Sequence, residues 1–356
     1  MEVSAPGRLC LFGEHQDYLA LPVIACPFDA RIRIEGRRRD DALFTFDLPD
    51  IGKRLTLDPR EEIPYGQARD YLPSVINILR REGLHYVRGY DIRVTSDIPM
   101  NAGCSSSSAF TVAWVAFLLA TQNGALPHDP ADIARLGHRA EVLEFNEPGG
   151  MMDHYTTCLG GLLYIDTREP IRCEPLPACP SGFVLGHSGE PKNTTGVLRD
   201  SRRAVTEGLE ALRRALPSFD LHSTPLAEAE AHFDALTPEQ QHRVRANLVN
   251  RDLCQEGKRL LGDPDFDDRR LGELLTAHHR QLADGLSVST PKIERMLEAA
   301  LAAGALGGKI NGSGGGGCMF AYAPGREEEV EDALITVGSA ARRICLDRGI
   351  GLPHCQ

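Results

Sequence analysis

Asp97-Ile-Pro-Met-Asn-Ala-Gly-Cys-Ser-Ser-Ser-Ser-Ala109 is the stretch that decides the fold. It follows residues 90–96, which alternate like a β-strand, and it leads into an apolar stretch of helical length, 106–121. Gly103 permits backbone conformations that are closed to other residues. The serines place N–H groups and hydroxyls at a helix N-terminus, where the helix dipole favours an anion. The segment therefore predicts a cradle for phosphate groups.

A serine-capped helix after an ordinary turn is the plainer explanation, but one serine is enough for a cap. The segment is not a Walker loop, because no Gly-Lys-Ser/Thr follows. A second cluster, GGKINGSGGGGC at residues 307–318, holds seven glycines in twelve residues. Such a run is entropically costly in an ordinary turn. It indicates a backbone that closely approaches a ligand or another segment, with a flexible hairpin as the alternative.

Polar residues with suitable chemistry lie in three further regions. Residues 6–18, PGRLCLFGEHQDY, read as a strand that ends at a glycine and is followed by Glu14, His15 and Asp17. These are the carboxylates and imidazole that can bind neighbouring hydroxyls. Glu141 falls in the second half of a predicted helix, and Asp153 follows a turn. Phosphoryl transfer needs a positioned acceptor, charge neutralisation and often a carboxylate base, although each acid taken alone could be a solvated or capping group.

In combination, these segments resemble the GHMP small-molecule kinases, and within them the galactokinase branch. APGRLCLFGEHQDY is similar to the galactokinase signature, and IPMNAGCSSSSAF is similar to the family's phosphate loop. GGKINGSGGGGC is similar to the C-terminal loop that is usually written Gly-Ala-Arg-Met-Thr-Gly-Gly-Gly-Phe-Gly-Gly-Cys. AEVLEFNEPGGMMDHY resembles the segment that carries the magnesium-binding Glu and the catalytic Asp. The motifs keep the family's order and span almost the whole chain.

The resemblance implies a role for each matching position. Asp153 is expected to be the general base, and Arg8 is expected to stabilise charge on the transferring phosphoryl group. Ser107 and Glu141 are expected to hold Mg²⁺, which bridges the ATP phosphates. The implied nucleotide-binding residues are Gly103, Ser105, Ser106, Ser107, Ser108 and, in the adenine pocket, Tyr71. The implied substrate-binding residues are Glu14, His15, Asp17 and Gly150.

Four departures from the galactokinase pattern surround the implied sugar site. They are Leu19-Ala20-Leu21 for Asn-Gly-Gly, Gln16 for Thr, Gly149 for Cys, and the absence of Tyr from residues 187–203. Lys192 in that last segment could meet an acidic group on a different substrate, or it could be a solvated surface lysine. The resemblance therefore implies a sugar kinase of the galactokinase type more firmly than it implies galactokinase itself.

Length and composition predict a two-domain protein. A chain of 356 residues with 42% hydrophobic residues can bury two cores. Strands dominate the first hundred residues and helices the second half, which predicts an α+β fold. A Pro-rich junction near 174–180 divides the chain into predicted domains 1–178 and 179–356. The resemblance implies an N-terminal domain like domain 2 of ribosomal protein S5 and a ferredoxin-like C-terminal domain. We also expect one last helix over residues 326–346.

The formal charge of −11 argues against a sequence-independent grip on nucleic acid. The ten cysteines include no C-x-x-C pair, which argues against zinc. The first residues lack the features of a signal peptide, and no apolar run is long enough to span a bilayer. We therefore expect a cytoplasmic protein with no membrane or nucleic-acid partner. The resemblance implies an enzyme that uses ATP and Mg²⁺, and we expect a monomer or homodimer.

Three functions remain open from the sequence. The first is a kinase for the anomeric C1 hydroxyl of galactose or a relative such as L-arabinose. The second is a kinase for a uronic acid, a heptose phosphate or another substrate of the same superfamily. The third belongs to another class, a non-catalytic sensor that binds sugar and ATP. Its weakness is that a sensor needs no base. A dinucleotide-binding oxidoreductase is excluded, because the glycine loops lack the combination of an opening strand, G-x-G-x-x-G and a downstream acidic residue.

Overall fold

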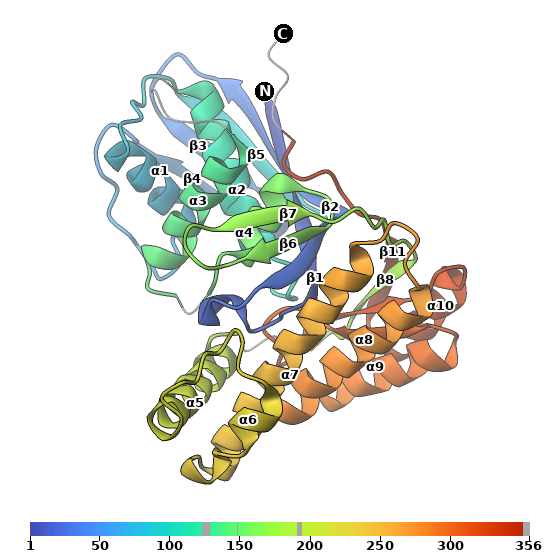
Figure 1. The fold of residues 1–356 in the computed structure, drawn as a ribbon. Helices are drawn as coiled ribbons and strands as arrows, with labels where there is room; N and C mark the ends of the chain where they lie inside the picture. Colours follow the sequence, from blue (N-terminus) through green and yellow to red (C-terminus); the bar gives the residue numbers. More distant parts are fainter. Residues whose placement is uncertain (123–128, 148, 191–193, 352–356) are drawn as a thin grey trace.

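The computed structural model describes residues 1–122, 129–147, 149–190 and 194–351 and has two α+β halves, each a sheet with helices packed on it (Figure 1). The strands of the first sheet are β1 (Glu2–Phe12), β2 (Val23–Arg38), β3 (Phe44–Leu48), β4 (Lys53–Leu57), β5 (Tyr90–Ser96), β6 (Leu163–Asp166) and β7 (Arg172–Pro175). Its helices are α1 (Tyr71–Arg81), α2 (Ser106–Thr121), α3 (Pro130–His138) and α4 (Met152–Leu159). The α+β prediction is confirmed.

The first sheet has the order β4-β3-β5-β2-β6-β7, and β1 pairs with β2 off this path. Within it β3 and β5 are parallel, and the other pairs are antiparallel. The β1–β2 ladder shifts register between Pro6 and Gly7 and again between Cys10 and Phe12. Register shifts of this kind change the direction in which side chains point. The two shifts lie on either side of Arg8.

Helix α2 begins within the phosphate-loop segment, at Ser106, and runs through the core of the first half. Most of its residues are buried, and Trp114 contacts Phe44 and Phe46 edge-on, with ring centroids 5.6 and 5.3 Å apart. A helix that is apolar on nearly all sides belongs in a core. Its N-terminus is thereby anchored, so the serines that begin it are held in place.

The second half contains a four-stranded antiparallel sheet in the order β11-β8-β10-β9. Its strands are β8 (Phe183–His187), β9 (Gly307–Ile310), β10 (Cys318–Tyr322) and β11 (Ala340–Ile344). Its helices are α5 (Thr194–Ala215), α6 (Leu226–Glu230), α7 (Pro238–Leu261), α8 (Asp268–Arg280), α9 (Pro291–Ala302) and α10 (Glu327–Val337). A second hydrophobic core joins this sheet to its helices and takes in Val184, Met296 and Leu334.

The expectation of one last helix over 326–346 is wrong. Helix α10 ends at Val337, and β11 then pairs with β8 from Ala340 to Ile344. Gly338 stops the helix, and the edge of β8 offers backbone hydrogen bonds that no local pattern reveals. The chain then returns to the first half, where Asp29 N–H donates to the Cys345 carbonyl and Gly351 pairs with Ser4. No helix among the described residues is long and apolar enough to cross a membrane.

Candidate active site

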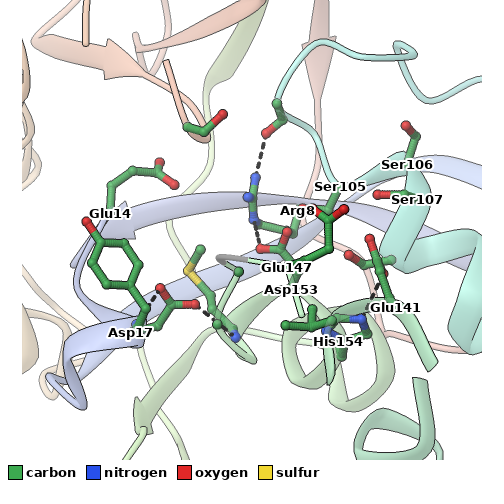
Figure 2. A pocket seen from close by; sticks show the side chains of 18 of the residues that line it. Arg8, Glu14, Asp17, Ser105, Ser106, Ser107, Glu141, Glu147, Asp153 and His154 are labelled. Atoms are coloured by element: carbon green, nitrogen blue, oxygen red, sulfur yellow. Dashed lines mark hydrogen bonds and ion pairs between the residues drawn. The ribbon is translucent and has the colours of Figure 1, made fainter. Parts of the chain in front are cut away.

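One cavity collects every site residue that the sequence predicted. Its lining includes Arg8, Glu14, His15, Asp17, Tyr71, Gly103, Ser105, Ser106, Ser107, Ser108, Glu141, Gly150 and Asp153. Figure 2 shows Glu14 and Asp17 on one side of the Arg8–Asp153 pair and Ser106, Ser107 and Glu141 on the other. The cavity therefore has an end rich in carboxylates, an end formed by the serine loop, and a charged pair between them.

The charged pair joins strand β1 to the first turn of α4. Arg8 Nε lies 2.7 Å from Asp153 Oδ1, and Arg8 Nη1 donates to the Gly103 carbonyl at 2.6 Å. Burial opposes the charge on Arg8, but the carboxylates of Asp153 and Glu14 outweigh it and raise the pKa of the guanidinium. Arg8 therefore stays protonated, and Asp153, which is 27% exposed, remains open to the cavity.

The phosphate loop has the backbone that its glycine and serines suggested. Gly103 has φ +86°, Ser105 has φ +58°, and α2 begins at Ser106. Among the described residues, the buried hydroxyl of Ser105 has no hydrogen-bond partner in the protein. An unsatisfied buried hydroxyl at a helix N-terminus fits an anion that accepts its hydrogen bond. The loop therefore fits the phosphates of ATP.

The second glycine cluster packs directly on this loop. A Cβ on Gly312 would lie 2.7 Å from Gly103, and one on Gly317 would lie 2.6 Å from the Ala102 carbonyl. Both glycines have φ +79°, and Cys318 N–H donates to Ala102 O at 2.8 Å. The prediction of close approach is confirmed, and the partner is the phosphate loop. The segment is also the loop of a hairpin, because β9 and β10 on either side of it pair antiparallel.

Glu141 lies in a π-helical turn, Arg139–Leu143, that continues α3. His154 Nε2 donates to Glu141 Oε2 at 2.8 Å, and Thr111 Oγ1 lies 3.0 Å from the same oxygen. Burial would raise the pKa of Glu141, but hydrogen bonds from His154, Ser107 and Ser108 hold it below its usual value. The hydroxyl of Ser107 and an ionised Glu141 are adjacent oxygen donors, the kind that Mg²⁺ prefers. This pair fits a magnesium ion.

Glu14 and Asp17, at the carboxylate-rich end of the cavity, have pKa values that are shifted in opposite directions. Burial would raise the pKa of Glu14, but Lys309, Arg8 and His15 lower it to about 2. Burial and the nearby charge of Asp153 raise the pKa of Asp17 to about 6, although N–H groups of Tyr18 and Met152 point at it. A Cβ on Gly150 would overlap the Asp17 carboxylate, so a larger residue here would have to displace that side chain.

Sequence reasoning missed several residues of the cavity. Arg69 pairs with Glu147 beside Tyr71, whose ring lies 5.9 Å from that of Phe145. His154 follows Asp153 directly, which was the available signal for it. Arg69 and Glu147 lie 78 positions apart in the sequence, so only the fold brings them together. Lys192, the candidate contact for an acidic substrate, lies outside the described residues.

Family models and relatives agree with this geometry. Residues 70–161 match the GHMP kinases N terminal domain, and residues 261–340 match the GHMP kinases C terminal domain. A mevalonate kinase of Thermococcus gammatolerans is 30% identical over 94% of this chain and 92% of its own length. The chain belongs to the GHMP kinases. That membership supports an ATP-dependent kinase and confirms the two-domain fold.

The relatives of this GHMP kinase differ in substrate. Residues 1–38 match the galactokinase galactose-binding signature, and a galactokinase of Mannheimia succiniciproducens is 30% identical over 93% of this chain and 87% of its own length. Among solved structures, galactokinase of Lactococcus lactis in complex with galactose has a TM-score of 0.84 at 21% identity. It covers 99% of this chain and 95% of that one. A mevalonate kinase of Methanococcus jannaschii has a TM-score of 0.72 at 18% identity and covers 98% of each.

Proposed function

We propose that this protein transfers the γ-phosphoryl group of ATP to the anomeric C1 hydroxyl of galactose or a closely related sugar. The observation that carries the proposal is the place of the Arg8–Asp153 pair, between the carboxylate end and the serine-loop end of the cavity (Figure 2). An acceptor at the first end and ATP phosphates at the second would meet at this pair. That is where phosphoryl transfer needs a base and a positive charge.

Each residue at the centre and at the serine-loop end of the cavity has its own role in the proposed reaction. Asp153 accepts the proton of the acceptor hydroxyl, whose oxygen forms a bond to the γ-phosphorus while the bond to ADP breaks. Arg8 keeps its charge and stabilises the negative charge on the transferred group. Main-chain N–H groups of Ser105 and Ser106 bind the phosphates. Ser107 and Glu141 would hold Mg²⁺, which supplies charge neutralisation at the ATP phosphates.

The charges of the cavity favour a neutral acceptor. Its described carboxylates are Glu14, Asp17, Glu141, Glu147 and Asp153. Its two described arginines, Arg8 and Arg69, are paired with Asp153 and Glu147. Carboxylates bind neighbouring sugar hydroxyls well, whereas an acidic acceptor such as mevalonate or a uronic acid would meet like charges. The galactose-binding signature over residues 1–38 supports the same conclusion.

Mevalonate remains the second candidate because mevalonate kinases are among the relatives at 29–30% identity over most of the chain. An assay of ADP release with Mg-ATP separates the candidates. The acceptors are galactose, L-arabinose, fucose, glucose, mannose, galacturonate, glucuronate, a heptose phosphate and mevalonate. We expect turnover of galactose or a neutral relative, with phosphate found at C1 by ³¹P NMR. Turnover of acidic acceptors alone would overturn the proposal. Sugar binding by calorimetry without any turnover would favour the sensor.

A further inference from the structure

Two buried polar side chains of the second glycine cluster have no role in the chemistry described so far. Lys309 lies in β9 and Asn311 immediately follows it, and both side chains are 0% exposed. Residues two apart on a strand point to the same side. A buried charge or amide is costly unless it is fully bonded. Both side chains belong to the second half, yet among their partners in the first half are Arg8, Gly103 and Glu14, which line the active-site cavity.

Lys309 bonds at the acceptor end. Its Nζ donates to Glu14 Oε2 at 3.0 Å and to the Cys10 carbonyl at 2.8 Å, and it lies 5.2 Å from the centre of the Phe320 ring. Gly312 N–H donates to the same Glu14 oxygen at 2.9 Å. Glu14 Oε2 therefore accepts two hydrogen bonds, from Lys309 and Gly312, and Lys309 helps to keep the carboxylate ionised. Glu14 also lines the cavity.

Asn311 bonds at the phosphate end. Its Oδ1 accepts from Cys10 N–H at 3.1 Å, while its Nδ2 donates to the carbonyls of Arg8 at 3.2 Å and of Gly103 at 2.8 Å. The Gly103 carbonyl also accepts from Arg8 Nη1. The related loops usually have Thr at this position, and a hydroxyl has one donor hydrogen where an amide has two. Asn311 uses both of its amide hydrogens, one on the Arg8 carbonyl of β1 and one on the Gly103 carbonyl of the phosphate loop.

We propose that Lys309 and Asn311 are positioning residues with separate tasks, Lys309 fixing Glu14 for the acceptor and Asn311 fixing Arg8 and Gly103 for the phosphates. The inference rests on the proposed function only for the identity of the acceptor. Both side chains bond to the backbone of Cys10, but Lys309 bonds further to Glu14 at the acceptor end and Asn311 to Gly103 at the phosphate end. Their tasks are therefore separable by steady-state kinetics.

Lys309→Met tests the acceptor arm. It removes the charge that holds Glu14, so KM for the acceptor should rise about 10- to 100-fold while KM for ATP stays within about twofold. Lys309→Met should have little further effect on acceptor KM in a Glu14→Gln background, because both changes act on one carboxylate. Lys258→Met is the matched control, since Lys258 forms a Lys–Glu pair with Glu174 on the surface, at 2.6 Å. It should leave both KM values unchanged.

Asn311→Asp tests the phosphate arm. The variant keeps the shape and the acceptor for Cys10 N–H but loses both donated bonds. We expect kcat to fall about 10- to 100-fold and affinity for a non-hydrolysable ATP analogue to fall, with acceptor KM within about twofold. Thermal denaturation of each variant checks that it folds. Calorimetry with the analogue needs no acceptor, so it reports on the inference even if the sugar assignment fails.

The two proposals can fail separately. A wild-type enzyme that phosphorylates only an acidic acceptor overturns the sugar assignment, and the kinetic split is then measured with that acceptor. Folded variants that change acceptor KM and nucleotide affinity by the same factors overturn the division of tasks. Additive effects of Lys309→Met and Glu14→Gln on acceptor KM also overturn it.

Discussion

Arg8 Nε lies 2.7 Å from Asp153 Oδ1, and the two residues come from parts of the chain 145 positions apart. Arg8 is on a strand that crosses the core, and Asp153 is in the first turn of α4. The buried guanidinium needs a counter-charge, and Asp153 supplies it at the edge of the cavity. The pair therefore serves the fold and the proposed chemistry with the same contact.

Asp153→Asn should abolish most turnover and leave acceptor binding near normal. The amide keeps the size of the carboxylate but cannot accept the proton, so kcat should fall by at least about 100-fold. Acceptor KM should change little, because Glu14 and Asp17 are untouched. Steady-state kinetics on the purified variant provide the measurement. Turnover within a few-fold of wild type would show that Asp153 is not the base.

Glu141→Gln should raise the Mg²⁺ concentration needed for half-maximal activity. Gln has one carbonyl oxygen and no charge, so it is a weaker magnesium ligand than the carboxylate. Ser107→Ala should raise the same Mg²⁺ requirement, because the side chains of Ser107 and Glu141 are in hydrogen-bond contact. Magnesium titrations of the two single variants and the double variant test this. Additive losses would argue against one shared metal ion.

Asp17 should make acceptor binding depend on pH near 6. Its pKa is raised to about 6 by burial and by the charge of Asp153. Above that pH the ionised carboxylate accepts hydrogen bonds from hydroxyls, and below it the protonated group accepts them more weakly. Acceptor KM should therefore rise as the pH falls from 7 to 5, measured as a pH profile. Asp17→Asn should remove this dependence, and a profile unchanged by the substitution would contradict it.

Asp17 should also make the stability of the fold fall as the pH rises, whereas an acid paired with a cation makes it rise. In the unfolded chain Asp has a pKa of about 3.9, so between about pH 4 and pH 6 the folded state keeps a proton that the unfolded state has lost. Asp17 therefore lowers stability as the pH rises through this window and costs the most above pH 6. Asp17→Asn should raise the melting temperature at pH 7.5 and have little effect near pH 4.

Gly150→Ala should weaken acceptor binding and leave nucleotide binding intact. The added Cβ would overlap the Asp17 carboxylate and displace it from the cavity. Acceptor KM should rise at least about tenfold, which corresponds to a loss of about 1.4 kcal/mol. Gly149→Ala is the control, since a Cβ there would meet only the Val142 side chain, at 3.4 Å. Equal effects of the two substitutions would contradict a specific role for Gly150.

The sequence predicted the parts of the site that depend on short segments. The phosphate loop, the polar turn after β1 and the position of Asp153 are each carried by a few consecutive residues whose types limit their backbone. All thirteen predicted site residues line one cavity. The roles assigned to them stay predictions until the variants are measured. The last strand, β11, was missed because its hydrogen bonds come from β8, more than 150 residues away.

What the sequence determined by itself is therefore local: a glycine that can take positive φ, serines at a helix N-terminus, and an apolar helix that must be buried behind them. Only the tertiary structure decided which segments meet. Lys309 and Asn311 read as ordinary residues in a glycine-rich loop, and their place behind Glu14, Arg8 and Gly103 appears once the two halves are packed together. Hydrogen bonds between residues 208 to 303 positions apart leave no trace in local periodicity, because burial of a polar group is decided by the whole fold.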